Sequence, residues 1–184
     1  TEMLIKIVFQ TRKAEEIVTS VRSYAKEQKL KKSPLSVNEV VTEAVKDFTS
    51  TLQDYPLQIE FEEDPRSPIC SLAPLEFELA VFNLLKNAKE ALKAQKADEP
   101  KVFIKISSGE THCFVDISDN GAVISDSDFE RMGSVFKSGK ASGLGIGLSI
   151  VRSIVQNHNG SLVLERGKNG GLVCRIRLPI LNAQ

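Results

Sequence analysis

Two asparagines four residues apart lie within an amphipathic stretch of the chain. Asn83 and Asn87 share one edge of a helix predicted over residues 74–96, at the border of its apolar stripe. Glu76 and Glu90 fall close to the same edge. Oxygen ligands of this kind suit Mg²⁺, which keeps several waters and is shared with substrate phosphates. Taken alone, the same pattern also describes the solvated face of an ordinary helix.

An acid stands at the end of an apolar segment that is predicted to be a strand, two residues after its span 113–117. Asp119 is followed by Asn120 and Gly121. A carboxylate at the end of a buried strand can accept a hydrogen bond from an exocyclic amine, such as that of adenine. A plain Asp-Asn-Gly turn explains the same residues. Taken alone, this segment therefore does not distinguish a nucleotide site from an ordinary turn.

Alternating glycines form the strongest of the three signals. Gly143, Gly145 and Gly147 let backbone amides come close to an anion. A helix predicted to begin near Gly147 points its N-terminal dipole the same way, and Lys137 and Lys140 can neutralise phosphate charge. No strand precedes these glycines, which excludes a Rossmann fingerprint, and a Walker A loop is absent. A flexible hinge remains the alternative.

The elements that must position these stretches are helices and strands without regular βαβ order. Period-2 patterns predict strands at 57–61, 102–106, 113–117, 161–165 and 172–178, the last two forming a closing hairpin. Helices are predicted after the capping residue Ser36, over 74–96, over 126–132 and from Gly147 to Asn159-Gly160. This mixture favours an α/β sandwich with one helical layer on one sheet.

The composition excludes several classes of protein. The 184 residues carry 24 Lys+Arg and 24 Asp+Glu, and this neutral balance disfavours a nucleic-acid binder. No run approaches the ~20 apolar residues of a membrane span. The three cysteines are an odd number in apolar stretches, so we expect buried thiols in a reducing compartment. Two histidines leave little for a His-based metal site.

The first 33 residues differ from the rest. They contain eight Lys/Arg and four Glu, a surplus of four positive charges. Ala14, Ile17, Val21 and Tyr24 form a heptad-like seam on a predicted helix. Such a seam needs a partner helix, since one helix of this length is marginal in water. Packing on its own domain is the alternative.

Together and in this order, the three stretches resemble the ATP-binding domain of sensor histidine kinases, within the superfamily that includes gyrase, Hsp90 and MutL. Residues 83–88 match the N box of this family, residues 119–121 the G1 box and residues 143–148 the G2 box. Phe136 stands at the position of the F-box phenylalanine, and residues 158–160 correspond to the His-Gly-Gly motif. The resemblance covers about residues 34–180. It implies a catalytic ATP-binding domain over residues 34–184. Residues 1–33 look like the second helix of the kinases' dimerisation hairpin.

The resemblance implies a two-layer α/β sandwich of the Bergerat type, preceded by a long helix, with ATP and Mg²⁺ as ligands. Asn87 would ligate Mg²⁺, Asn83 would support the phosphate side, and Asp119 would bond the adenine amine. Further implied nucleotide-binding positions are Gly121, Phe136, Lys140, Gly143, Leu144, Gly145, Ile146, Gly147 and Leu148, with 133–142 as a mobile lid. Asn83, Asn87 and Lys140 are the candidate catalytic residues.

The implied function is transfer of the ATP γ-phosphoryl group to a histidine not present in this chain, for signalling to a response regulator receiver domain. The histidine would come from a hairpin in cis or in trans. Residues 1–33 would form a homodimer in the full-length protein. The implied location is cytoplasmic, either free or as part of a membrane-anchored sensor.

Four departures from the family pattern keep other interpretations open. Val123 stands where a second G1 glycine is expected, Leu79 where Glu, Gln or His is frequent, and the lid from Phe136 to Ser142 is short. Neither His112 nor His158 resembles the phosphoacceptor, and both are interpreted as structural. We therefore expect a fragment of a longer kinase that does not phosphorylate itself.

Two alternatives to an active kinase remain open. Val123 and Leu79 favour a degenerate, non-catalytic module for nucleotide binding or docking. An ATPase-driven clamp like those of the gyrase group is weaker, because its water-activating acid would stand where this chain has Leu79.

Overall fold

The computed structural model of the protein describes residues 31–52, 55–130, 132, 145–168 and 170–181. The chain divides into two compact units, Thr1–Lys31 and Lys32–Gln184. The helices and strands that the structure describes belong to the second unit. The predicted seam from Ala14 to Tyr24 lies outside the described residues.

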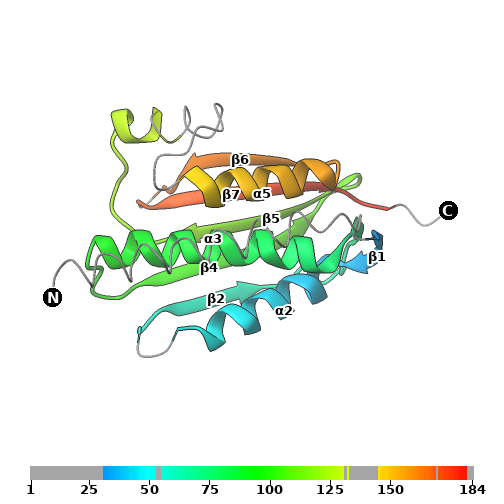
Figure 1. Cartoon of the computed structure of the whole chain (residues 1–184), viewed down its shortest axis with the longest axis horizontal. Coiled ribbons are helices and arrows are strands. Elements are labelled where there is room, and N and C mark those ends of the chain that lie inside the picture. The colour runs from blue at the N-terminus through cyan, green and yellow to red at the C-terminus, as the bar shows by residue number, and fades with distance from the viewer. Residues whose placement is uncertain (1–30, 53–54, 131, 133–144, 169, 182–184) are drawn as a thin grey trace, which may run out of the picture. The chain divides into compact units, whose positions relative to one another are not determined.

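A five-stranded mixed sheet forms one layer, in the order β2-β4-β5-β7-β6 (Figure 1). Its strands are β2 Gln58–Glu62, β4 Lys101–Ser108, β5 His112–Asp119, β6 Ser161–Arg166 and β7 Leu172–Pro179. β2 runs parallel to β4, whereas the other neighbours are antiparallel. All five strands were predicted, with β2 shifted by one residue.

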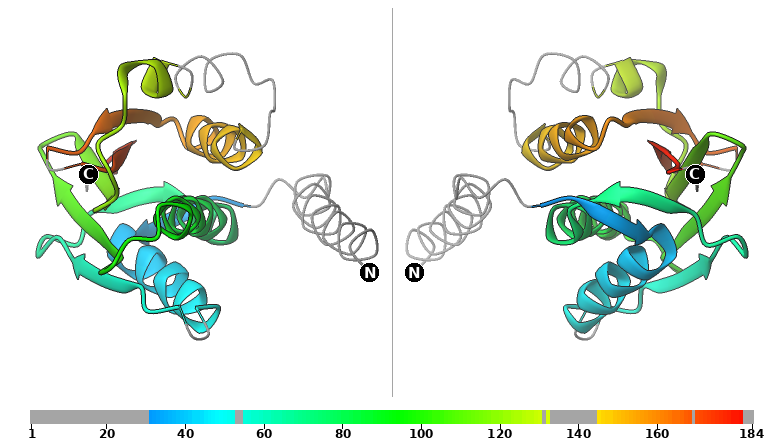
Figure 2. Two further views of the ribbon diagram at one scale, coloured as in Figure 1. Left: turned by 90° about the vertical axis from the view of Figure 1, so that its left-hand side faces the viewer. Right: turned by 90° about the vertical axis from the view of Figure 1, so that its right-hand side faces the viewer.

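Three helices, α2 Val37–Ser50, α3 Pro74–Ala94 and α5 Gly145–Asn157, cover one face of this sheet. They lie side by side with α3 in the middle (Figure 2). The predicted sandwich with one helical layer is confirmed. The opposite face carries paired charges such as Lys105 with Glu62, whose Nζ and Oε1 atoms are 2.6 Å apart.

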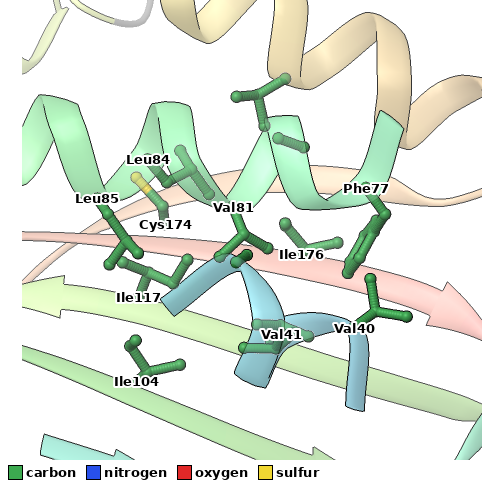
Figure 3. Packing of buried hydrophobic residues seen from close by; sticks show 14 of the residues in the cluster. Val40, Val41, Phe77, Val81, Leu84, Leu85, Ile104, Ile117, Cys174 and Ile176 are labelled. Atoms are coloured by element: carbon green, nitrogen blue, oxygen red, sulfur yellow. The ribbon is translucent and has the colours of Figure 1, made fainter. Parts of the chain in front are cut away.

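The core fills the space between the helices and the sheet. Val81, Leu84 and Leu85 of α3 point towards the strands that carry Ile104, Ile117, Cys174 and Ile176 (Figure 3), and all are buried. β4 and β5 alternate buried and more exposed residues along their length. Each large apolar side chain buried in this way contributes about 1.5–3 kcal/mol. The residues facing the core are therefore those that the period-2 and helical patterns select.

The ends of α3 are fixed by local sequence. Pro74 occupies the first turn, where its missing N–H costs no hydrogen bond. At the other end the amide of Ala97 donates to the Leu92 carbonyl (3.2 Å) and that of Lys96 to the Lys93 carbonyl (3.2 Å). These bonds form a Schellman motif, with Lys96 in the left-handed region at a φ of 52°.

Two short strands were not predicted. β1 Ser33–Ser36 and β3 Ile69–Leu72 pair antiparallel in a separate two-stranded sheet. Four residues each are too few to display a period. The helix after Ser36 was predicted correctly, and the Ser36 hydroxyl accepts from the Glu39 amide at 3.4 Å.

Candidate functional site

α3 links the sequence motifs that were singled out for chemistry. Asn83 and Asn87 lie on α3 beside the first turn of α5, while Gln95 at the carboxyl end of α3 lies beside Gly121 after β5. Segments 60 residues apart along the chain are thus brought to one helix. Figure 1 shows α3 running between α5 and the rest of the helical layer.

Both asparagine carboxamides face the start of α5. A β-carbon on Gly147 would lie 3.2 Å from Asn87 Oδ1 and 3.6 Å from Asn83 Oδ1. The first turn of α5 also presents backbone N–H groups without helical partners, together with the positive end of the helix dipole. Carboxamide oxygens and free amides at one place suit an anion with its counter-cation.

The two asparagines differ in how well they are satisfied. Asn83 donates from Nδ2 to the Leu79 carbonyl at 2.8 Å. Asn87 Nδ2 is buried and has no hydrogen-bond partner within the described residues. An unpaired buried amide is costly, so the nitrogen of Asn87 is suited to a group that the protein itself does not supply.

α5 is held against α3 by apolar packing and by one histidine. Val151, Ile154 and Val155 are buried. The His158 ring, 2% exposed, accepts from the Ala73 amide at Nε2 (3.0 Å) and donates from Nδ1 to the Ile154 carbonyl (2.7 Å). Both ring nitrogens are used, so His158 is structural, as predicted. Burial lowers its pKa, which keeps the ring neutral.

Asp119 ends β5 with its carboxylate turned inward. It is 9% exposed, and it accepts from the Gly121 amide at Oδ1 (2.9 Å) and the Leu172 amide at Oδ2 (3.2 Å). Burial raises the pKa of Asp119, and these two amides oppose the rise. A carboxylate has about four acceptor positions, so Asp119 keeps acceptor capacity for a ligand.

Asn120 fixes the direction in which the chain leaves β5. Its Oδ1 accepts from the Lys101 amide at 2.8 Å and its Nδ2 donates to the Glu99 carbonyl at 2.8 Å. These bonds extend the pairing with β4 by one residue. The Asp-Asn-Gly segment therefore does form a turn, and that turn places the Asp119 carboxylate.

Two residues near Asp119 were not among the predicted site residues. Gln95 Oε1 accepts from the Ala122 amide at 2.7 Å. Gly171, at a φ of 71°, passes so close that a β-carbon would lie 2.6 Å from Asp119 Oδ1. In the sequence Gly171 stands only in the connection between the two strands of the predicted closing hairpin, and there is no signal for Gln95.

Several predicted site positions lie outside the described residues: Phe136, Lys140, Gly143 and Leu144, and with them the predicted lid. Gly145 opens α5 and Ile146 follows it, while Leu148 packs partly buried against the core. Val123 is 80% exposed, so its side chain does not fill the space beside Asp119. Leu79 is partly buried against the core.

Other classes of site find no support in the described part of the second unit. It contains no group of three or more His, Cys, Asp or Glu side chains that could hold a metal. Within the same ranges no helix has the length and apolar character needed to span a membrane. Cys70, Cys113 and Cys174 are buried and unbridged, as expected, and burial raises the pKa of Cys174 to about 12.

Comparison with protein families gives one match. Residues 73–182 match the family described as "Histidine kinase-, DNA gyrase B-, and HSP90-like ATPase". This range contains all three of the motifs and covers more than half of the chain.

Two curated relatives are similar along most of this chain. The C4-dicarboxylate transport sensor protein DctS of Rhodobacter capsulatus is 26% identical over 95% of the chain. The sensor protein FixL of Bradyrhizobium diazoefficiens is 26% identical over 92%. The chain spans only 27% of the length of DctS and 34% of that of FixL.

Solved structures share the fold. The catalytic domain of the histidine kinase ThkA has a TM-score of 0.67 and 24% identity, over 80% of this chain and 95% of that domain. ThkA in complex with the response regulator protein TrrA has a TM-score of 0.76 and 23% identity, over 98% of this chain and 51% of the ThkA chain.

Proposed function

The chain belongs to the family of histidine kinase-, DNA gyrase B- and HSP90-like ATPases and carries the catalytic domain of a histidine kinase, and we propose that it binds Mg-ATP along α3 for phosphoryl transfer to a histidine outside this chain. One observation carries the proposal. The same helix brings Asn83 and Asn87 to the start of α5 and Gln95 to Asp119–Ala122.

The bound nucleotide would lie with its base at Asp119 and its phosphates at the first turn of α5. Eight residues separate Asn87 from Gln95, a rise of about 12 Å along the helix. This spacing suits a nucleoside triphosphate extended along α3. The inward Asp119 carboxylate would accept from the adenine amine, and the α5 amides would bond to phosphate oxygens.

We assign Asn87 as the Mg²⁺ ligand of the site. Its carboxamide faces Gly147 at the start of α5, and its Nδ2 is buried without a partner in the protein. A carboxamide oxygen is a suitable ligand for this hard cation, and Nδ2 would donate to a phosphate oxygen. Bound Mg²⁺ would neutralise phosphate charge and help to align the γ-phosphoryl group.

In the proposed reaction a lone pair of an imidazole nitrogen attacks the γ-phosphorus. A phosphorus–nitrogen bond forms, the phosphorus–oxygen bond to ADP breaks, and ADP leaves with the electron pair. The residues of this chain would contribute positioning and charge neutralisation, which are the main requirements of phosphoryl transfer. Lys140, Phe136, Gly143 and Leu144 remain proposed contributors.

The acceptor is proposed to be a histidine of a hairpin supplied in cis or in trans. His158 has both nitrogens bonded and is buried. His112 Nδ1 lies 2.7 Å from the Thr111 hydroxyl and 3.3 Å from an Arg177 guanidinium nitrogen. These contacts support structural roles for both.

A response regulator receiver domain is the proposed downstream partner, in analogy to the complex of ThkA with TrrA. Residues 1–33 are proposed as the second helix of a dimerisation hairpin and residues 34–184 as the catalytic domain. The full-length protein would then be a cytoplasmic homodimeric kinase or the cytoplasmic part of a membrane-anchored one.

A non-catalytic module is the second candidate function. Leu79, where the family often has a polar residue, packs partly buried against the core and offers no group for acid–base chemistry. This observation favours a domain that binds nucleotide without transferring phosphate.

Calorimetric titration of the chain with ATP and ADP, with and without Mg²⁺, tests the binding step. We expect binding that Mg²⁺ strengthens, and absence of binding would overturn both candidates that involve nucleotide. Adding a histidine-bearing hairpin and γ-labelled ATP then separates them. Label on the hairpin histidine supports the kinase, whereas binding without label supports the non-catalytic module.

A further inference from the structure

Gln95 is held in a defined position at the carboxyl end of α3. Its backbone amide donates to the Ala91 carbonyl at 3.1 Å, and the Schellman bonds of Lys96 and Ala97 close the helix immediately after it. Its side-chain oxygen is fixed in turn by the Ala122 amide at 2.7 Å. The residue is exposed, so these bonds set its conformation rather than burial in the core.

The side chains of Gln95 and Asp119 converge at Gly121. A β-carbon on Gly121 would lie 2.6 Å from Asp119 Oδ1, 2.7 Å from Gln95 Oε1 and 3.4 Å from Gln95 Nε2. The two side chains therefore flank a single point, which only glycine leaves open. Both come within reach of one edge of a small heterocycle.

The two groups differ in the hydrogen bonds they can still make. Asp119 is an acceptor, with each oxygen occupied once by a backbone amide. Gln95 Nε2 is a donor that has no hydrogen-bond partner in the described ranges. Turning the Gln95 carboxamide over would place its NH₂ group against the Ala122 N–H. The Ala122 amide thus fixes Oε1 towards the loop and leaves Nε2 for a ligand.

Resting on the proposed function, we propose that Asp119 and Gln95 together read the Watson–Crick edge of the base, which makes Gln95 a specificity-determining residue for adenine. Asp119 would accept from the exocyclic amine, and Gln95 Nε2 would donate to the neighbouring ring nitrogen N1. Adenine presents this donor and acceptor side by side. Guanine presents a carbonyl oxygen and an N–H in their place, so both contacts would be mismatched.

The test uses Gln95→Glu, which keeps an oxygen for the Ala122 amide but removes the donor. Titrations of parent and variant with Mg-ATP, Mg-GTP and 1-deaza-ATP, in which N1 is replaced by carbon, separate the contact with N1 from the contact with the loop. We expect the variant to lose about tenfold in affinity for ATP and in the preference for ATP over GTP. Its affinity for 1-deaza-ATP should equal that of the parent.

Ala94→Glu adds the same charge one residue away and serves as the matched control, with affinity for ATP as in the parent. If Gln95→Glu binds ATP like the parent, or loses affinity for 1-deaza-ATP to the same extent, the assignment of Gln95 is wrong. If the parent binds none of these nucleotides, the proposed function fails as well, and the two failures are thereby distinguished.

Discussion

The two parts of the proposed nucleotide site, a base end around Asp119 and a phosphate end around Asn87, differ in how far the protein completes their hydrogen bonds. At the base end, Asp119, Asn120 and Ala122 all bond to other parts of the protein. At the phosphate end, Asn87 keeps a buried nitrogen without a partner in the described residues. The first arrangement is ready before any ligand arrives, whereas the second is complete only with one.

Under the proposed function, this difference predicts different roles for the two ends. A preformed base end can select the nucleotide at little cost in ordering, because its groups already hold their positions. An unsatisfied phosphate end gains most when phosphate and Mg²⁺ bind, since the penalty for its unpaired group is then removed. Substitutions at the base end should therefore affect both folding and binding, and substitutions at the phosphate end binding alone.

The largest effect is expected for Asp119→Asn. An asparagine has one acceptor oxygen for the two amides of Gly121 and Leu172, and its NH₂ group would face a donor. We expect nucleotide affinity to fall about 100-fold or more and the free energy of unfolding to fall by about 1–3 kcal/mol. Calorimetry and urea unfolding measure the two effects.

Asp116→Asn is the matched control, because Asp116 lies on the opposite face of the same strand and pairs with Arg175 at 2.7 Å. It should leave nucleotide affinity unchanged. Equal losses in the two variants would show that Asp119 does not contact the base.

Asn87→Ala should separate binding from folding. It removes the proposed Mg²⁺ ligand, so we expect a loss of about 10–100-fold in affinity for Mg-ATP. It also removes an unpaired buried group, so the free energy of unfolding should change by less than about 1 kcal/mol. When EDTA removes the metal, the difference in affinity between parent and variant should become smaller, because only the proposed hydrogen bond from Nδ2 to phosphate is then lost. A loss of stability as large as that of Asp119→Asn would break the contrast between the two ends.

How far the sequence predicts this molecule depends on the range of the interactions involved. Regular patterns predicted α3 and strands β4 to β7, because burial of one face acts on consecutive residues. β1 and β3 were not predicted because they are four residues long and pair mainly with each other, across more than 30 positions of the chain. The parallel pairing of β2 with β4 likewise has no local signature.

The same reasoning applies to the site. Asp119 and the asparagines could be proposed from the sequence because their residue types and spacing suit the chemistry. Gln95 was missed, since its contact with Ala122 spans 27 positions and depends on where α3 ends. Gly171 was interpreted only as a turn residue, because its approach to Asp119 depends on the pairing of β5 with β7.

The pH dependence of stability should report on His158, which lies at the carboxyl end of α5, opposite the first turn where the phosphates are proposed to bind. Burial holds the pKa of His158 below its usual 6.5 in the folded protein. The unfolded chain then binds more protons between the folded value and 6.5, so stability rises with pH in this window. The contribution is complete above pH 6.5 and is lost as the pH falls towards the folded pKa.

Urea unfolding of parent and His158→Gln between pH 5 and 8 measures this contribution. The variant should show a smaller rise in stability over the same window. Protonation would also remove the acceptor for the Ala73 amide, which joins the ends of α3 and α5. An identical pH slope in both proteins would mean that His158 does not titrate in this range.

The smallest effect is expected for Lys96→Gly, which should stabilise the base end without changing a group that is proposed to contact the ligand. Lys96 has a φ of 52°, where a β-carbon is strained and glycine is favoured. Relief of this strain exceeds the entropy that glycine adds to the unfolded chain, so we expect a gain of about 0.5–1 kcal/mol in the free energy of unfolding. Because the backbone of Gln95 keeps its place, affinity for ATP and preference over GTP should match the parent. A change in that preference would show that the base end is adjustable, and the distinction between a preformed and an unsatisfied end would no longer hold.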